Sequence, residues 1–204
     1  MIMDNIQVRG TGRHSDEFLN YYASKEVTLN DYDEYEKFIK GCEHAVRKDH
    51  RYNAYLAKLK SNGLDFCAVL GNLKEDNKVK LEMHHGPIFN LFDIWDIVPR
   101  AMFARGEKRI TTFQVAKRVL EEHERDNIMI VMLSKSPHKG GHFNVFIHIK
   151  STVGRIERFI DRYHDGMTNE HWGYITRYIE QCKKVEHTTD NGLVDTAKRL
   201  KVFK

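Results

Sequence analysis

The chain has 204 residues, of which 41% are hydrophobic and 30% are charged, and its formal net charge is +4. This length accommodates one domain with extensions or two small domains, each with a hydrophobic core. No apolar run approaches the ~20 residues of a membrane-spanning helix, and the N-terminus lacks the apolar segment of a secretory signal, so we expect a cytoplasmic protein with no membrane partner.

Cysteine and histidine usage narrows the chemistry further. Cys42, Cys67 and Cys182 are odd in number and scattered, with no C-x-x-C pair. This pattern argues against a disulfide framework and fits a reducing compartment. The twelve histidines are more unusual. Most of these histidines must have no catalytic or metal-binding role. The informative ones are those whose spacing would let them bind one metal ion or act together in catalysis.

The N-terminal part predicts a loop followed by helix. Residues 1–30 carry little periodicity and include the glycine-rich, polar run VRGTGRHSDE. From Asn30, which suits a helix cap, apolar residues recur at helical spacing. The pattern continues, with or without a break, to the stop signal at Asn62–Gly63.

The next segment predicts β-structure. A short apolar run at 64–70 and an alternating run at 79–85 predict two strands joined by a hairpin-like loop. Gly86–Pro87 ends the second strand, because proline has no N–H to donate to a ladder. Further along, 127–134 predicts a buried strand and 143–149 predicts another.

Helices are predicted on both sides of the strand at 127–134. Before it, residues 88–106 are apolar enough for a buried helix despite Pro99, and a second helix follows. After it, two amphipathic segments lead to a polar, basic tail. The predicted helix caps are Thr111 or Thr112, Ser151, and Thr168 or Asn169.

Four histidines stand in an order that suits a metal site. LEMHHGP (81–87) ends a strand with His84 and His85, and SPHKGGH (136–142) places His138 and His142 four residues apart. On a helix this spacing puts both imidazoles on one face, where they can share a metal ion. Neutral imidazole is a good ligand for such an ion.

These segments, with DNIMIVMLS (126–134) between them, resemble the HNH (ββα-metal) endonuclease superfamily. Its members have a strand ending in a His pair or Asp-His, then an Asn, then an apolar strand that leads into a short helix with one or two histidines. LSKSPH stands where many members have L-C-x-x-C-H, so the structural zinc knuckle of those relatives is absent. The chain is also similar to bacteriophage proteins with HNH-like motifs, in which a long helical insertion follows the His pair.

The resemblance implies an α+β fold in which a small ββα-metal element is embedded among helices. Residues 1–63 would form an N-terminal arm and helical region. Residues 64–150 would form the HNH-like core, with a helical insertion at 88–126. Residues 151–204 would supply C-terminal helices and a basic tail. A viral protein that acts in the host cytoplasm is also implied.

The resemblance further implies that His84, His138 and His142 bind a divalent metal ion (Zn, Mg, Mn or Ni) and that His85 is the general base. An imidazole with a pKa near ~6.5 accepts a proton from water at neutral pH. The metal would stabilise the pentavalent phosphorane and the leaving oxygen. Asn127 is the nearest match to the family's Asn, which steadies the base.

The four histidines also have simpler interpretations, in which they do not form a metal site. Neighbours on a regular strand face opposite sides, so His84 and His85 serve together only if the strand bends at Gly86–Pro87. His138 and His142 are alternatively surface residues of a glycine-rich turn.

Several other side chains also have two interpretations. The helical spacing turns His123 toward apolar neighbours, which predicts a core histidine bonded to a backbone carbonyl. The alternative is that His123 contacts the metal ion, one of its ligands or a phosphate group. Lys135 and Lys139 are either phosphate contacts or part of a solvated face, and the same holds for Arg155 and Arg158. The aromatic residues Phe89, Phe92 and Trp95 are expected in the core or at an interface.

The sequence leaves three functions open. The first is a metal-dependent endonuclease that hydrolyses phosphodiester bonds in nucleic acid, with DNA expected as the substrate ahead of RNA. The second is a non-catalytic module with a structural zinc ion, which binds nucleic acid or a host protein. The third is a structural or regulatory fold without metal. Nothing in the sequence indicates the oligomeric state.

Overall fold

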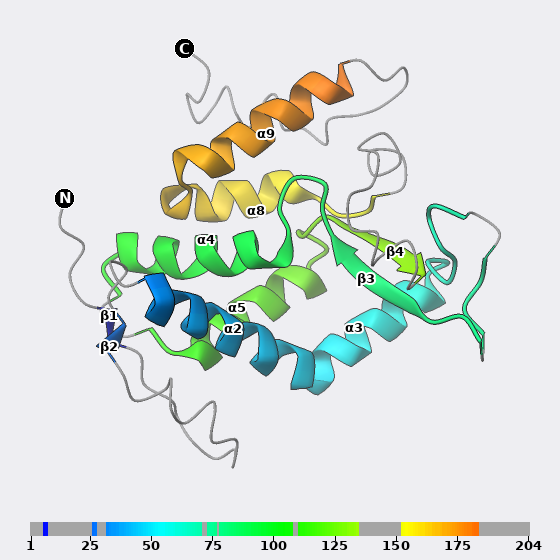
Figure 1. Cartoon of the computed structure of the whole chain (residues 1–204), viewed down its shortest axis with the longest axis horizontal. Coiled ribbons are helices and arrows are strands. Elements are labelled where there is room, and N and C mark those ends of the chain that lie inside the picture. Colours follow the sequence, from blue (N-terminus) through cyan, green and yellow to red (C-terminus); the bar gives the residue numbers. More distant parts are fainter. Residues whose placement is uncertain are drawn as a thin grey trace.

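The described part of the chain is an α+β fold that combines helices with two short antiparallel strand pairs, and the longer pair lies to one side of the helices (Figure 1). The computed structural model describes residues 6–7, 26–27, 32–70, 73–76, 78–107, 110–134 and 152–183. In chain order the elements are β1 (Ile6–Gln7), β2 (Glu26–Val27), α2 (Tyr32–Lys48), α3 (His50–Ser61), β3 (Leu81–His85), α4 (Leu91–Ala104), α5 (Thr112–Glu124), β4 (Ile130–Ser134), α8 (Ile156–Tyr163), the 3₁₀ turn η1 (His164–Gly166) and α9 (Asn169–Cys182).

β3 and β4 form the longer strand pair, with His85 opposite Ile130 and Leu81 opposite Ser134, whereas β1 and β2 form a separate antiparallel pair. The predicted hairpin between 64–70 and 79–85 is wrong. In the apolar run at 64–70, residues 68–70 form a turn and Phe66 makes an isolated antiparallel bridge to Lys74. The Ala68 N–H donates to the Met132 carbonyl of β4 at 2.9 Å. Apolar character alone did not distinguish a strand from a turn that packs on the core.

Local capping signals place most helix starts. Of the predicted alternatives, Thr111 and Thr168 are the caps, each in a reciprocal capping box, and Asn90 caps α4 in the same way. The long N-terminal helix does break, at Asp49, whose side chain accepts the Arg51 N–H at 2.8 Å. The start predicted at Ser151 is wrong, because α8 begins at Ile156 after Arg155, which supplies no side-chain cap.

α4 lies at the centre, between the α8–α9 pair and the group formed by α2, α3 and α5 (Figure 1). It is apolar on nearly every side, and burial of Trp95 and Phe89 matches the prediction of a core. Phe92 is the exception, because it is 42% exposed at the start of the helix. No helix in the described ranges is long and apolar enough to cross a membrane.

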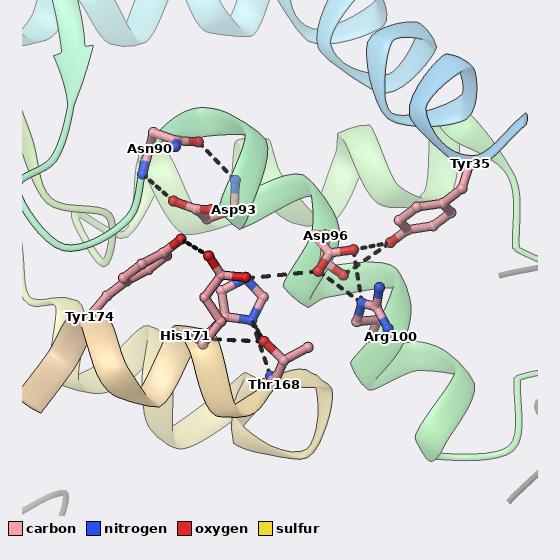
Figure 2. A network of polar contacts seen from close by, with 9 residues as sticks. Tyr35, Asn90, Asp93, Asp96, Arg100, Thr168, His171 and Tyr174 are labelled. Carbon is pink, nitrogen blue, oxygen red and sulfur yellow. Dashed lines mark hydrogen bonds and ion pairs between the residues drawn. The ribbon is translucent and has the colours of Figure 1, made fainter. Parts of the chain in front are cut away.

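A buried polar network joins α2, α4 and α9 (Figure 2). The Asp96 carboxylate on α4 accepts the Tyr35 hydroxyl at 2.5 Å and the Arg100 Nε–H at 2.8 Å. His171 on α9 places its Nε2 3.8 Å from the same carboxylate. A carboxylate is costly to bury unless it is paired and hydrogen-bonded. These partners compensate Asp96, and they connect three helices that are distant in sequence.

The contact between η1 and α4 leaves no room for a side chain at Gly166. A Cβ there would overlap the Ile97 carbonyl oxygen and the Ala101 amide nitrogen. We expect Gly166→Ala to lower the free energy of unfolding by about 2 kcal/mol or more, because α4 backbone would have to move. Urea denaturation measures the change.

Gly173→Ala is the matched control. Gly173 lies inside α9, and a Cβ there would meet nothing within 4 Å. Alanine should stabilise this helix by ~0.5–1 kcal/mol. Equal effects of the two substitutions would contradict the close packing of η1 on α4.

Candidate functional site

His84 and His85 lie on opposite faces of β3. The strand stays regular to its end, and burial alternates from Leu81 through His85. His85 faces the core and is 6% exposed, whereas His84 is partly exposed on the other face. The Gly86 N–H continues the pairing by donating to the Met129 carbonyl at 3.2 Å. Within the described residues, β3 alone therefore does not direct both imidazoles to one metal ion.

His85 instead pairs with His123, whose ring has no exposed surface. Their Nε2 atoms lie 2.8 Å apart, and the Nδ1 atom of His123 lies 2.7 Å from the Val119 carbonyl oxygen. Because a carbonyl only accepts, Nδ1 of His123 carries the proton, its Nε2 accepts, and Nε2–H of His85 donates. The rings of Tyr52 and Tyr55 pack edge-on against His123 from α3.

The surroundings keep His123 neutral. Burial lowers the pKa of His123 from 6.5 to about 4, and the hydrogen bond to Val119 opposes that shift only partly. His123 therefore faces the core, as its helical spacing predicted. A base that acts at Nε2 of His85 would first have to break the bond to His123.

Asn127 lies just before β4, but its side chain binds a carboxylate. Its Nδ2 donates to Glu122 Oε2 at 2.7 Å, and its backbone N–H donates to the Glu122 carbonyl at 2.9 Å. Asn127 is 2% exposed and Glu122 is fully buried. The Asn127 amide thus fixes the loop between α5 and β4.

His138, His142, Lys135 and Lys139 lie outside the described residues. Across 32–70, 73–76, 78–107, 110–134 and 152–183, no group of three or more His, Cys, Asp or Glu residues is arranged to hold a metal ion. The chain leaves β4 at Ser134 and re-enters beside the other end of that strand, where Val153 pairs with Ile130. The two flanks of the undescribed segment therefore lie at opposite ends of β4.

A second site is a pocket of about 410 Å³ between α5, α8 and the end of α4. We call it the basic pocket. Most of its lining residues are cationic, and the only carboxylate among them is Glu121. Its lining residues are Arg105, Gln114, Lys117, Arg118, Glu121, Arg125, Arg162 and Tyr163.

Carboxylates outside or beneath the pocket orient its arginines. Arg105 makes a two-point pair with Asp165, with both N···O distances at 2.8 Å. Arg162 and Arg125 both donate to the buried Glu122, Arg125 at 3.3 Å. The side chains of these arginines are nonetheless 38–51% exposed, and all three line the pocket.

Lys117 differs from these arginines. Within the described part of the chain its ammonium group forms no ion pair or hydrogen bond, and its side chain is exposed where it lines the pocket. An uncompensated cation beside oriented guanidinium groups makes the basic pocket suited to an anion.

Comparison with known proteins gives a family. A model of the bacteriophage G278-like virion proteins matches residues 4–201, nearly the whole chain. The chain belongs to the bacteriophage G278-like virion protein family. Neither curated proteins nor solved structures gave a match. The expected phage origin is therefore supported, and nothing in these comparisons indicates the HNH superfamily.

Sequence reasoning missed the basic pocket of this virion protein. One signal was available, because Gln114, Lys117, Arg118, Glu121 and Arg125 follow the i, i+3, i+4, i+7 and i+11 spacing of one helix face. The other lining residues come from the end of α4 and from α8, and only the tertiary fold brings them to α5.

The buried, neutral imidazole of His123 predicts acid sensitivity. The folded-state pKa of His123 is about 4, below the unfolded value of 6.5, so its contribution to stability is complete above pH 6.5 and is lost as pH falls toward 4. His123→Gln removes this titration. Its stability deficit relative to wild type should shrink by about 2.5 kcal/mol between pH 7.5 and 4.5.

Urea unfolding of both proteins at the two pH values measures this change. Tyr52→Phe serves as a control, because it alters the same packing layer without removing an imidazole. Its deficit should vary much less with pH. A deficit of His123→Gln that stays constant would mean that His123 takes up its proton in the folded state.

Proposed function

We infer that this virion protein binds nucleic acid without cutting it, and that the sugar-phosphate backbone occupies the basic pocket. The observation that carries this proposal is the convergence of cations from α5, α8 and the end of α4 on one hollow. Its volume lies in the range of small-ligand sites, about 300–1,000 Å³. Membership of a virion protein family is compatible with contact to phage nucleic acid.

The chemistry of the pocket favours phosphate over bases. Guanidinium groups form two-point hydrogen bonds with phosphate oxygens, and lysine adds a compact point charge. The one aromatic lining residue, Tyr163, is 3% exposed and so offers no face for base stacking. We therefore expect binding that depends on salt and little on sequence, with DNA and RNA both accepted.

The buried His85–His123 pair supports binding over hydrolysis. A general base must reach the water that it deprotonates. His85 is 6% exposed, and its Nε2–H is engaged by His123. The pair therefore has the properties of a core hydrogen bond more than those of a catalytic dyad.

Lys117→Ala tests the binding proposal. Because Lys117 has no carboxylate partner in the described ranges, its loss should weaken binding without disturbing an ion pair. We expect about a tenfold weaker affinity for labelled oligothymidylate at low salt, and a salt dependence reduced by about one phosphate contact. Fluorescence anisotropy over a salt series gives both quantities.

Lys78→Ala is the matched control. Lys78 is also an exposed lysine, but it lies in the loop before β3, outside the pocket. Both variants lose one positive charge, so a general charge effect would weaken them equally. Equal affinities of the two variants would refute the basic pocket as the binding site.

A second candidate is the metal-dependent HNH-type endonuclease. One observation favours it: β3, which ends in His84 and His85, pairs with β4, which follows Asn127, so two strands of a ββα element are adjacent in the expected chain order. In this proposal His84, His138 and His142 hold the metal ion and His85 is the base.

Plasmid nicking in the presence of Mg, Mn, Ni or Zn separates the two candidates. The endonuclease proposal expects metal-dependent nicking that His85→Ala abolishes while metal binding and DNA binding persist. The binding proposal expects no nicking above that of a mock preparation with any of the four metals. Nicking that survives both His84→Ala and His85→Ala would exclude the HNH mechanism.

A further inference from the structure

Glu122 is a fully buried carboxylate beneath the basic pocket. It lies on α5 next to the pocket residue Glu121, but its side chain has no exposed surface. Four groups donate to it: Arg162 from α8, Arg125 at 3.3 Å, Asn127 at 2.7 Å and the Tyr163 hydroxyl at 3.4 Å. Two of these donors are guanidinium groups that line the pocket.

We propose that Glu122 is a positioning residue of the basic pocket, which strengthens phosphate binding through Arg125 and Arg162. Its Oε1 engages one edge of each guanidinium group, while the side chains remain 51% and 41% exposed. The N–H groups that Glu122 does not engage are thereby left at the pocket, where the Nη2 of Arg125 also lies 3.8 Å from Glu121. This inference rests on the proposed nucleic-acid binding and adds a role for a residue that never touches the ligand.

The proposal makes a prediction opposite in sign to simple electrostatics. A negative charge beneath an anion site repels the anion, so removal of that charge alone should tighten binding. Removal of a positioning group should instead weaken binding, because two long side chains would lose their orientation. The direction of the change therefore distinguishes the two effects.

Orientation should outweigh repulsion for two reasons. Arginine binds phosphate through a planar fork, so affinity depends on the direction of the N–H groups as well as on charge. A free arginine also loses rotamer freedom when it binds, and a fixed one has lost it already. The negative charge of Glu122, by contrast, is already offset by the two guanidinium groups that donate to it.

Glu122→Gln is the first test, made in the full chain. Glutamine keeps the shape and still accepts the Asn127 N–H, but it removes the charge and turns an amide donor toward the arginines. We expect about tenfold weaker binding of labelled oligothymidylate, although the net charge rises by one. Affinity equal to or tighter than wild type would overturn the positioning role.

Arg162→Lys keeps the test decisive if Glu122→Gln does not fold. Lysine retains the positive charge but lacks the fork, so we again expect about tenfold weaker binding. Arg47→Lys is the matched control, because Arg47 is an exposed arginine paired with Glu43 on α2, away from the pocket. Wild-type affinity of Arg162→Lys would overturn the proposal.

A double-variant comparison distinguishes positioning from general loss of structure. If Glu122 acts through the arginines, Glu122→Gln should add no further loss to Arg125→Ala/Arg162→Ala. Full additivity would overturn the positioning role. Failure of the wild-type chain to bind oligothymidylate would overturn the proposed function and this inference together. Normal binding by wild type and by Glu122→Gln would overturn this inference alone.

Discussion

The burial of the Glu122 charge constrains much of this molecule. A carboxylate without exposed surface is tolerated only when charged and hydrogen-bonded partners surround it. The partners of Glu122 come from the end of α5, from the loop that enters β4, and from α8. These partners hold α8 against α5 and fix the loop that enters β4. The interactions of Glu122 therefore link the helices to the β-structure, and they also lie directly beneath the basic pocket.

The second buried carboxylate, Asp96, differs from Glu122 in how much of its partners is exposed to solvent. Its arginine partner, Arg100, is 24% exposed, and the other partners are buried groups of α2 and α9. This network connects helices and leaves little cationic surface. The arginines of Glu122 are more exposed and lie beside Lys117. The same chemistry, a buried charge held by arginine, therefore serves packing at Asp96 and is suited to recognition at Glu122.

How much of this structure the sequence predicts depends on how far apart in the chain the interacting residues lie. Capping residues such as Thr111 and Thr168 act within one turn, so they locate the starts of α5 and α9 correctly. The inward direction of His123 follows from helical periodicity in the same way. The partner of β3 depends on tertiary packing, and the run at 64–70 had the composition of a strand without forming one. The basic pocket combines one helix face with Arg105 and Arg162, which no local pattern connects.

Whether the His85–His123 pair favours nucleic-acid binding or hydrolysis depends on the conditions that an imidazole needs in order to act as a general base. Two imidazoles that share one proton in the core are stable only while both rings are neutral, because a charge there would lack solvation. Catalysis needs the reverse, a ring that gains and loses a proton in contact with water. His123 satisfies the first condition, because burial lowers its pKa, and the edge-on rings of Tyr52 and Tyr55 add to that burial. His84 points to the other face of the same strand and is partly exposed, so of the two β3 histidines it is the one that meets the need for contact with water.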